Sequence, residues 1–344
     1  MDPVALLDEV VKLGASDLHI THKIPPTVRL HGRLHPLEGY EPMTPESIGR
    51  LVEALTTPEL RQRFAENGEL DFSYGVEGIG RFRCNLFRQR GCMALVLRVI
   101  NTVIPSFEDL GLTPVIRNVC QKKDGLVLVT GPTGSGKSTT LAAMIDWINQ
   151  NRPEVIITLE DPIEFLHEHK RGIVNQRDVG HDTKGYALGL RAALREDPDI
   201  ILVGEMRDSE TIEIALKAAE TGHLVFSTLH TRTAASTVDR IIDTFPPHQQ
   251  SQIRTQLAGS LQAVISQTLV PRRGGKGRVA AREILLATPA VRNLVREGKS
   301  HQIDSMIETG ARHGMQTMAA ALDEFLSRGL IDREEIEARK SAKG

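Results

Sequence analysis

The sequence predicts an α/β protein in which a smaller α+β domain precedes a domain built on a mostly parallel sheet. After residue 124, apolar segments of strand length alternate with stretches long enough for crossover helices, the pattern of an α/β core. Before residue 100, apolar and polar residues alternate in short segments, which favours antiparallel strands. A glycine-rich run, Gly131–Thr139, follows the first of the later apolar segments and indicates the ligand-binding edge of the parallel sheet.

Composition excludes several classes of protein. The 344 residues are 40% hydrophobic and 25% charged, which fits a globular chain of about two domains. A net charge of -2 argues against binding nucleic acid through bulk charge. Three cysteines without metal-ligand spacing fit a reducing compartment. Because no apolar run approaches bilayer-spanning length, we expect a cytoplasmic protein with no nucleic-acid partner and no direct membrane insertion.

Residues 1–100 are predicted to form the α+β domain. A capping residue followed by proline marks the start of a helix. Such pairs stand at Asp2-Pro3, Thr44-Pro45 and Thr57-Pro58. Short strands are expected at 18–21 and 27–30. The stretch 70–99 has period two, with turns expected at 75–80 and at Gly91, so it should form an antiparallel hairpin or meander.

Residues 101–124 are expected to be a linker with a helix start at Thr113-Pro114, and the domain boundary is placed near Asp124. The second domain, 125–344, contains four apolar strand candidates. They are 126–129, 155–159, 200–203 and 224–228. After Phe245 the sequence predicts mostly helix up to a turn at 272–278, followed by a strand at 279–285. From about residue 289 a small helical part is expected.

The glycine-rich run matches the phosphate-binding pattern G-x-x-x-x-G-K-S/T, and its position between a buried strand and a helix is the required setting. Its glycines let the backbone wrap a phosphate chain, Lys137 can reach the β and γ phosphates, and Ser138 can offer a hydroxyl to Mg²⁺. A plain glycine-rich turn would explain the glycines but not the Lys-Ser pair. The residues expected to bind ATP are Gly131, Pro132, Thr133, Gly134, Ser135, Gly136, Lys137, Ser138 and Thr139.

Two carboxylate clusters follow later strands of the predicted sheet. Glu205 ends the strand 200–203 after Gly204, and we interpret it as the general base that activates water. A glutamate that merely begins a loop is the plainer alternative. Because Gly204 stands where P-loop enzymes usually carry an aspartate, the hold on Mg²⁺ must come from elsewhere. Glu160 and Glu164 are the candidates, acting through water.

Histidines and arginines complete the candidate site. His223 and His230 flank one strand, and His230, at its carboxyl end, is placed to sense the γ-phosphate. His223 is interpreted as a cap or a subunit contact. Arg83 lies on the polar face of an alternating strand, and periodicity alone favours a solvated residue. Arg98 interrupts an apolar run, and a half-buried arginine needs an anionic partner, for which a neighbouring subunit's phosphate would qualify.

Together these motifs resemble those of the secretion-type ATPases, and two further segments are similar to the type IV pilus retraction ATPases. They are Ala15–His19 and Ala290–Glu297. The resemblance implies a PAS-like N-terminal domain, a RecA-like ATPase domain and a homo-hexamer. It further implies a position peripheral to the inner membrane, through a platform protein of the pilus machine, and ATP-driven pilin disassembly.

The resemblance also assigns roles. It implies that Lys137, Glu160, Glu205 and His230 lie at the nucleotide, and that Arg83 and Arg98 complete the site. In the segment 290–297, Arg292 and Arg296 are four apart on the polar face of a predicted helix that could bind a partner. A solvated helix is the alternative. Arg232, where relatives commonly have a small polar residue, puts the local subunit contact in doubt.

Three other functions stay open at this point. An accessory retraction ATPase, paralogous to the principal one, shares most of the motifs. A nucleotide-controlled docking protein would use bound ATP only to select a conformation. A DNA translocase on the same core is disfavoured by the near-neutral charge.

Overall fold

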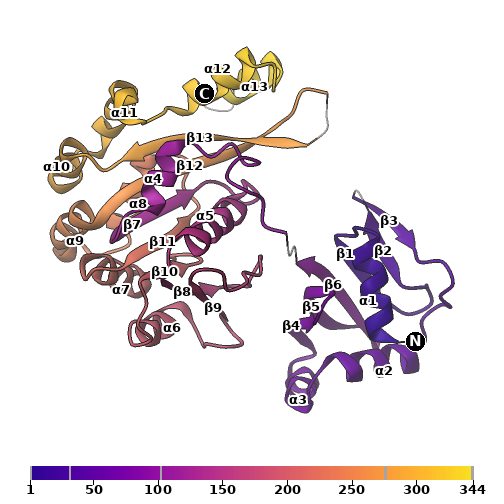
Figure 1. Cartoon of the computed structure of the whole chain (residues 1–344). Helices are drawn as coiled ribbons and strands as arrows, with labels where there is room; N and C mark the ends of the chain where they lie inside the picture. Colours follow the sequence, from indigo (N-terminus) through magenta and orange to yellow (C-terminus); the bar gives the residue numbers. More distant parts are fainter. Residues whose placement is uncertain (1, 31, 101–102, 275–276, 342–344) are drawn as a thin grey trace. The chain divides into compact units, whose positions relative to one another are not determined.

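The computed structural model describes residues 2–30, 32–100, 103–274 and 277–341, and it divides into two compact units (Figure 1). The first comprises Met1–Val103 with Glu164–Leu166, and the second comprises Ile104–Ile163 and His167–Gly344. The chain therefore divides near residue 103 and not near Asp124. Among the described residues, no helix has both the length and the apolarity needed to cross a bilayer.

The segment expected to be a linker belongs to the second unit from Ile104 onward, whereas residues 101 and 102 lie outside the described residues. Phe107, Leu112 and Ile116 are buried in the same core as the neighbouring parallel strands. The predicted helix is present as α4 (Pro114–Cys120). A free linker would leave these apolar side chains in water, so burial in the core is favoured.

The first unit is a six-stranded antiparallel sheet with the order β3-β2-β1-β6-β5-β4 and three helices. Its helices begin where the cap-and-proline pairs predicted, and Asp2, Thr44 and Thr57 each accept a backbone N–H. The bounds are α1 (Pro3–Lys12), α2 (Pro45–Leu55), α3 (Pro58–Asn67), β1 (Asp17–Ile20), β2 (Thr27–Leu30), β3 (Arg33–Pro36), β4 (Glu69–Val76), β5 (Gly80–Gln89) and β6 (Cys92–Ile100). The predicted meander is confirmed, whereas the short, exposed strand β3 was not predicted.

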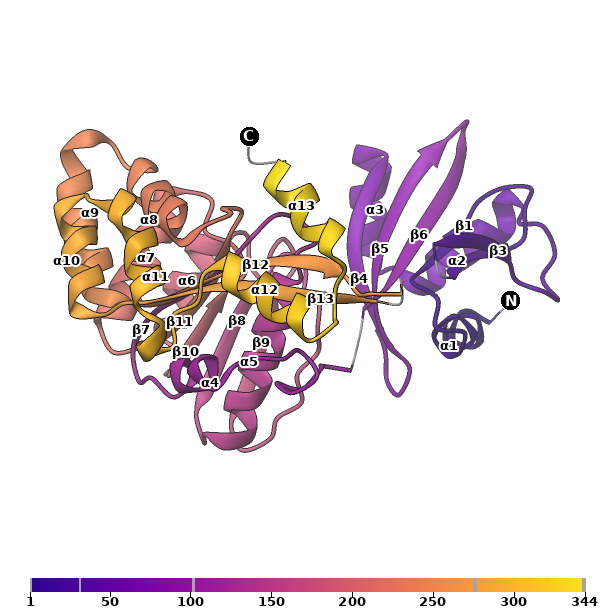
Figure 2. The ribbon, with the colours of Figure 1, turned by 90° about the horizontal axis from the view of Figure 1, so that it is seen from above.

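The second unit is a seven-stranded sheet with the order β13-β12-β7-β11-β10-β8-β9, parallel except for the edge strand β13. Helices α4 and α5 pack on one face, and α7, α8 and α9 on the other, so the sheet is the middle of three layers (Figure 2). The strands are β7 (Gly125–Thr130), β8 (Val155–Glu160), β9 (Ile173–Asp178), β10 (Ile200–Val203), β11 (Leu224–Leu229), β12 (Leu261–Pro271) and β13 (Arg278–Leu286). The covering helices are α5 (Lys137–Asn151), α6 (Tyr186–Ala193), α7 (Ser209–Glu220), α8 (Ala234–Asp243) and α9 (Pro247–Ser260).

The prediction of mostly helix between Phe245 and residue 272 was wrong in its second half. Helix α9 ends at Ser260, and the chain continues directly into β12, which pairs with β7 and β13. A short apolar run is compatible with either a buried helix or a buried strand, and no glycine or proline separates the two elements here. Strand β9 was also missed, because four of its six residues are polar or charged and it lies at the sheet edge.

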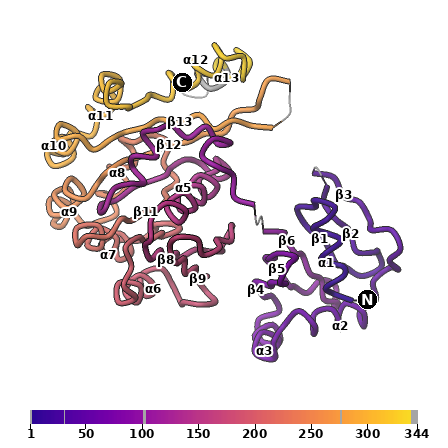
Figure 3. Tube along the Cα trace, viewed as in Figure 1, coloured from indigo at the N-terminus to yellow at the C-terminus, as the bar shows by residue number. Residues whose placement is uncertain are grey.

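The C-terminal part is helical from Pro289, as predicted. The trace leaves β13 and passes along one side of the second unit (Figure 3). Val291 and Val295 anchor the first helix in the core beneath it. The elements are α10 (Pro289–Glu297), η1 (Ser300–Gln302), α11 (Ile303–Thr309), η2 (Ala311–His313), α12 (Met318–Ser327) and α13 (Arg333–Ser341).

Candidate nucleotide site

The glycine-rich loop connects β7 to α5, with Gly136 as the N-cap of the helix. Gly131 has a φ of 144°, and a Cβ there would lie 2.2 Å from the carbonyl oxygen of Gln267. The backbone can therefore adopt this path only with glycine. Lys137 Nζ donates to the carbonyl oxygens of Gly131 and Pro132, at 2.9 and 3.2 Å. The lysine ammonium is thus held over the loop, where phosphates bind at a helix N-terminus.

The carboxyl ends of four adjacent strands bring the other predicted residues to the same edge of the sheet. The loop follows β7, His230 follows β11, and Glu205 comes after β10. Glu160 is the last residue of β8, the next strand along. Because these strands are parallel neighbours, residues far apart in sequence meet at one edge, where α/β proteins bind ligands.

Glu205 is held between two cationic or protonatable side chains. His230 Nε2 lies 3.2 Å from Glu205 Oε1, and Arg207 Nη2 lies 2.8 Å from Glu205 Oε2. Burial by itself raises the pKa of Glu205, but the hydrogen bond from Arg207 and the nearby charges outweigh it, and the net pKa is lowered. The carboxylate is therefore ionised at neutral pH and able to accept a proton. Sequence reasoning missed Arg207, because the loop conformation alone turns it back to Glu205.

Gly204 occupies a tight position, where a side chain would force its neighbours to shift. A Cβ there would lie 3.0 Å from the hydroxyl of Tyr186 and 3.1 Å from the carbonyl of Leu159. Its own backbone is fixed on both sides, since its N–H donates to Leu159 and its carbonyl accepts from Thr228 Oγ1 at 2.6 Å. This packing gives a physical reason for the absence of the usual aspartate, and it fixes the start of the Glu205 loop.

Glu160 is oriented by its own strand and by the neighbouring one. Its Oε1 accepts hydrogen bonds from Thr158 Oγ1 at 2.7 Å and from Gln176 Nε2 at 3.1 Å. Gln176 lies on β9, which sequence reasoning did not predict. These two hydrogen bonds fix the orientation of the Glu160 carboxylate at the end of β8.

Glu164, Arg83 and Arg98 belong to the first unit, and their roles at a nucleotide stay predictions. Arg98 was expected to be half-buried, which is wrong. Its side chain is 68% exposed, and its Nε contacts Asp17 Oδ1 at 3.0 Å. Period two places Arg98 on the solvent face of β6, opposite Arg83 on β5. The anionic partner of this exposed arginine, Asp17, lies on the adjacent strand β1.

His223 lies at the amino end of β11, opposite His230. Its Nδ1 lies 2.9 Å from the carbonyl oxygen of Ala218, and its backbone N–H donates to the same oxygen. These contacts close the C-terminal end of α7. Of the two readings left open for His223, the capping role is the one that its contacts show.

The donor set fits a nucleotide-bound magnesium ion. No group of three or more His, Cys, Asp or Glu residues that could hold a metal occurs in the described part of the chain. Mg²⁺ in phosphate sites usually relies on one or two protein oxygens, substrate phosphates and water. Ser138 and Glu160 supply oxygens of this kind beside the loop.

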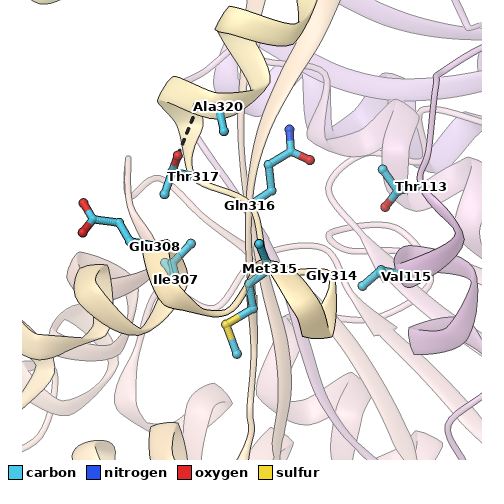
Figure 4. A pocket seen from close by; sticks show the side chains of 10 residues that line it. Thr113, Val115, Ile307, Glu308, Gly314, Met315, Gln316, Thr317 and Ala320 are labelled. Atoms are coloured by element: carbon cyan, nitrogen blue, oxygen red, sulfur yellow. Dashed lines mark hydrogen bonds between the residues drawn. The ribbon is translucent and has the colours of Figure 1, made fainter.

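A separate pocket lies away from these residues (Figure 4). It has a volume of about 390 Å³ and lies between the start of α4 and the segment from α11 to α12. Its lining includes Val115, Ile307 and Met315, and none of the predicted nucleotide-binding residues contributes to it. The nucleotide site is therefore defined by its loop and strand ends and not by this cavity.

Fold and site together define a P-loop nucleotide hydrolase, and comparison with known proteins specifies the family. The model of the type II/IV secretion system protein family matches residues 4–338. The type IV pilus retraction ATPase PilT of Pseudomonas aeruginosa is 50% identical over 343 residues, covering 100% of this chain and 98% of the relative. The type IV pilus ATPase PilU of the same organism is 42% identical, over 96% of this chain and 86% of the relative.

A crystal structure of the pilus retraction motor PilT with bound ADP has a TM-score of 0.91 and 51% identity, covering 97% of this chain and 96% of that chain. The chain therefore belongs to the type II/IV secretion system protein family, and it is an ATPase. The resemblance to pilus retraction ATPases is confirmed, as is an α/β fold with two sheets.

Proposed function

We propose that this chain is an ATP-driven motor that powers the retraction of type IV pili. The observation that carries the chemistry is Glu205, held by Arg207 and His230 at the sheet edge that also bears the phosphate-binding loop. The near full-length identity to a relative named as a pilus retraction ATPase supports the biological role. The accessory ATPase PilU is less similar and is the lesser alternative.

Each residue then has a defined task. Lys137 and the loop N–H groups bind the β and γ phosphates of ATP. Glu205 accepts the proton of the attacking water, and His230, in contact with Glu205, senses the γ-phosphate. Ser138 provides a hydroxyl to Mg²⁺, and Glu160 and Glu164 orient its waters. The ion, when bound, neutralises charge that develops on the phosphates.

The assembly follows from the same proposal. The first unit is a PAS-like domain, the second is a RecA-like domain, and six copies form a ring. Arg83 and Arg98 contact the nucleotide of a neighbouring subunit. The ring works in the cytoplasm, docked through a platform protein of the inner membrane. Opening and closing of subunit interfaces during hydrolysis would produce the mechanical step.

The test compares Lys137→Ala with Glu205→Gln. Lys137→Ala should weaken ATP binding and turnover together, because the lysine contacts phosphate both in bound ATP and in the transition state of hydrolysis. Glu205→Gln should retain ATP and lose turnover by about 10²- to 10⁴-fold, the usual contribution of a general base. Glu213→Gln is a matched control, because Glu213 is a half-exposed residue of α7 paired with Lys217. Binding is measured by nucleotide fluorescence and turnover by phosphate release.

A turnover of Glu205→Gln close to that of the parent would remove Glu205 from the role of base. The same variants separate a motor from a nucleotide-controlled docking protein in cells that lack their own retraction ATPase. A motor without turnover cannot restore twitching, whereas a docking protein that only needs bound ATP would restore it. Restored twitching by Glu205→Gln would therefore contradict the proposed motor.

A further inference from the structure

A group of buried polar side chains contacts the phosphate-binding loop, and none of them has a role in the proposed hydrolysis. Gln267 is 2% exposed and lies on β12, the strand next to β7. Its Nε2 donates to the carbonyl oxygen of Ser135 at 2.6 Å, and its Oε1 accepts from Thr140 Oγ1 at 2.8 Å. One amide thus holds both the loop and the first turns of α5. Its backbone carbonyl also sets the closest approach at Gly131.

Arg282 joins this group from the edge strand β13. Its side chain is buried, and the residue is 6% exposed. Its Nε donates to Gln267 Oε1 at 3.1 Å, and its Nη1 donates to the carbonyl oxygen of Leu110 at 3.0 Å. Gly111 offers a second, longer contact at 3.4 Å. The guanidinium therefore connects Gln267 to the segment of the second unit that precedes α4.

The surroundings of Arg282 are costly for a charged group. It has no ion pair within the described part of the chain, and burial lowers its pKa to about 10. It is still protonated at neutral pH. Its Nη2 is buried without a hydrogen-bond partner among the described residues. Burying an arginine with an unused donor costs free energy, so its presence at this position points to a role beyond stability.

We propose that Gln267 and Arg282 form a polar relay that positions the phosphate-binding loop and couples it to the Leu110–Gly111 segment. Phosphate binding between Gly131 and Lys137 presses on Ser135 and Thr140. Gln267 contacts both, and Arg282 passes the displacement to the two carbonyls. The segment 104–113 follows the first unit in the chain, so the relay gives that segment a response to the nucleotide. The inference rests on the proposed nucleotide site and adds two positioning residues to it.

The test uses Gln267→Glu and Arg282→Met in the full chain. Gln267→Glu keeps an acceptor for Thr140 and Arg282 but loses the donor to Ser135. It should raise the KM for ATP and the Kd for ADP about tenfold, as expected for one lost hydrogen bond, while kcat changes little. Arg282→Met keeps the loop contacts of Gln267 but breaks the link to Leu110.

Hydrogen exchange in the segment 104–113 distinguishes a relay from a pair of residues that only stabilise the loop. In the parent chain, ADP should change protection of this segment, and both variants should lose that response. Arg152→Gln is the matched control, because Arg152 donates to the carbonyls of Cys120 and Lys122 but has no contact with the loop. It should keep both the response and the KM, even if its melting temperature falls.

Three outcomes overturn the relay. They are an unchanged KM in folded Gln267→Glu, an absent ADP response in the parent, and a retained response in both variants. If Arg282→Met does not fold, Gln267→Glu still decides the matter through its KM and its exchange pattern. Loss of ATP hydrolysis in the parent chain itself would instead count against the proposed function. The two failures are therefore distinguishable.

Discussion

Glu205 and Arg98 are charged residues of the two sheets, and their environments differ sharply. Glu205 has a side chain only 17% exposed and is contacted by Arg207 and His230 from its own unit. Arg98 is 68% exposed and has one carboxylate, Asp17, on the adjacent strand. Its cross-strand neighbour Arg83 is exposed and has no ion pair among the described residues. The charge of Glu205 is balanced by side chains of its own unit. Arg83 and Arg98 together carry two positive charges and contact one carboxylate, so the pair can also bind an external anion.

The largest effect is expected from removing these arginines. Arg83→Ala and Arg98→Ala should each be nearly inactive, because arginine contacts to a transferring phosphoryl group can contribute about 10³- to 10⁵-fold in rate. Arg63→Ala is the control, an exposed arginine of α3 in the same unit. Mixing inactive Arg98→Ala with inactive Lys137→Ala should restore some ATPase activity if the arginines serve a neighbour's site.

Co-assembly of the mixed proteins is confirmed by tagged pull-down. Mixed rings without recovered activity would place the arginines in their own subunit's site or make them structural. Asp17→Asn sharpens the result. Asp17→Asn keeps a side-chain oxygen that can accept a hydrogen bond from Arg98 Nε, so this variant should remain far more active than Arg98→Ala. Equal losses in the two variants would indicate that Arg98 acts only through Asp17.

The site at the parallel edge was largely predictable because sequence motifs and sheet topology act together. The loop pattern identifies Lys137, and apolar strands of parallel orientation place Glu205 and His230 at one edge. The contacts that orient these residues were not predictable. Gln267 and Arg282 are single polar residues inside strands, with no spacing to mark them. Arg207 reaches Glu205 only through the conformation of an irregular loop.

The same limit applies to the antiparallel sheet. Alternation in the sequence predicted the polar face for Arg83, whereas the apolar run around Arg98 was interpreted as burial, and neither pattern predicts the partner of either residue. Asp17 is 81 residues away in the chain and becomes a neighbour only because β1 pairs with β6. Strand pairing of this kind is decided by packing of the buried faces. The local pattern therefore predicted the face of Arg83 correctly and the burial of Arg98 wrongly.

A smaller effect is expected from Arg207, and it depends on pH. The pKa of Glu205 is lowered in the folded protein, mainly because Arg207 opposes the effect of burial. Activity that needs ionised Glu205 is present above this pKa and is lost as the pH falls through it. In Arg207→Gln, burial remains and raises the pKa, so the acidic limb of kcat/KM should move to higher pH. A shift of one pH unit means about tenfold less activity on that limb.

The measurement is a kcat/KM profile of ATP hydrolysis from neutral pH down through the acidic limb of the parent. Arg191→Gln is a suitable control, because Arg191 pairs with exposed Glu210 at 2.6 Å and has no contact with Glu205. An unchanged acidic limb in Arg207→Gln would mean that the ionisation of Glu205 does not limit catalysis. A shift in both variants would indicate a general loss of positive charge and not the specific ion pair.

The smallest effect on hydrolysis is expected in α10, where the same comparison recurs within one helix. Arg292 was predicted to lie free on a polar face, but its Nε donates to Ala287 at 3.0 Å and its Nη1 to Ala258 at 2.7 Å, with a further contact to Gly259. It closes the C-terminal end of α9. Arg296 is exposed, with no hydrogen bond or ion pair among the described residues.

Arg292→Ala should therefore lower the free energy of unfolding by about 1–3 kcal/mol, because it leaves partly buried carbonyls without donors. Arg296→Ala should change it by less than about 0.5 kcal/mol and leave ATPase activity intact. If α10 binds a partner, Arg296→Ala should nevertheless reduce twitching in cells, since its charge has no task within the chain. Thermal unfolding, phosphate release and a motility assay measure the three quantities. Normal twitching by Arg296→Ala would identify α10 as a solvated helix whose arginine at 292 serves the fold alone.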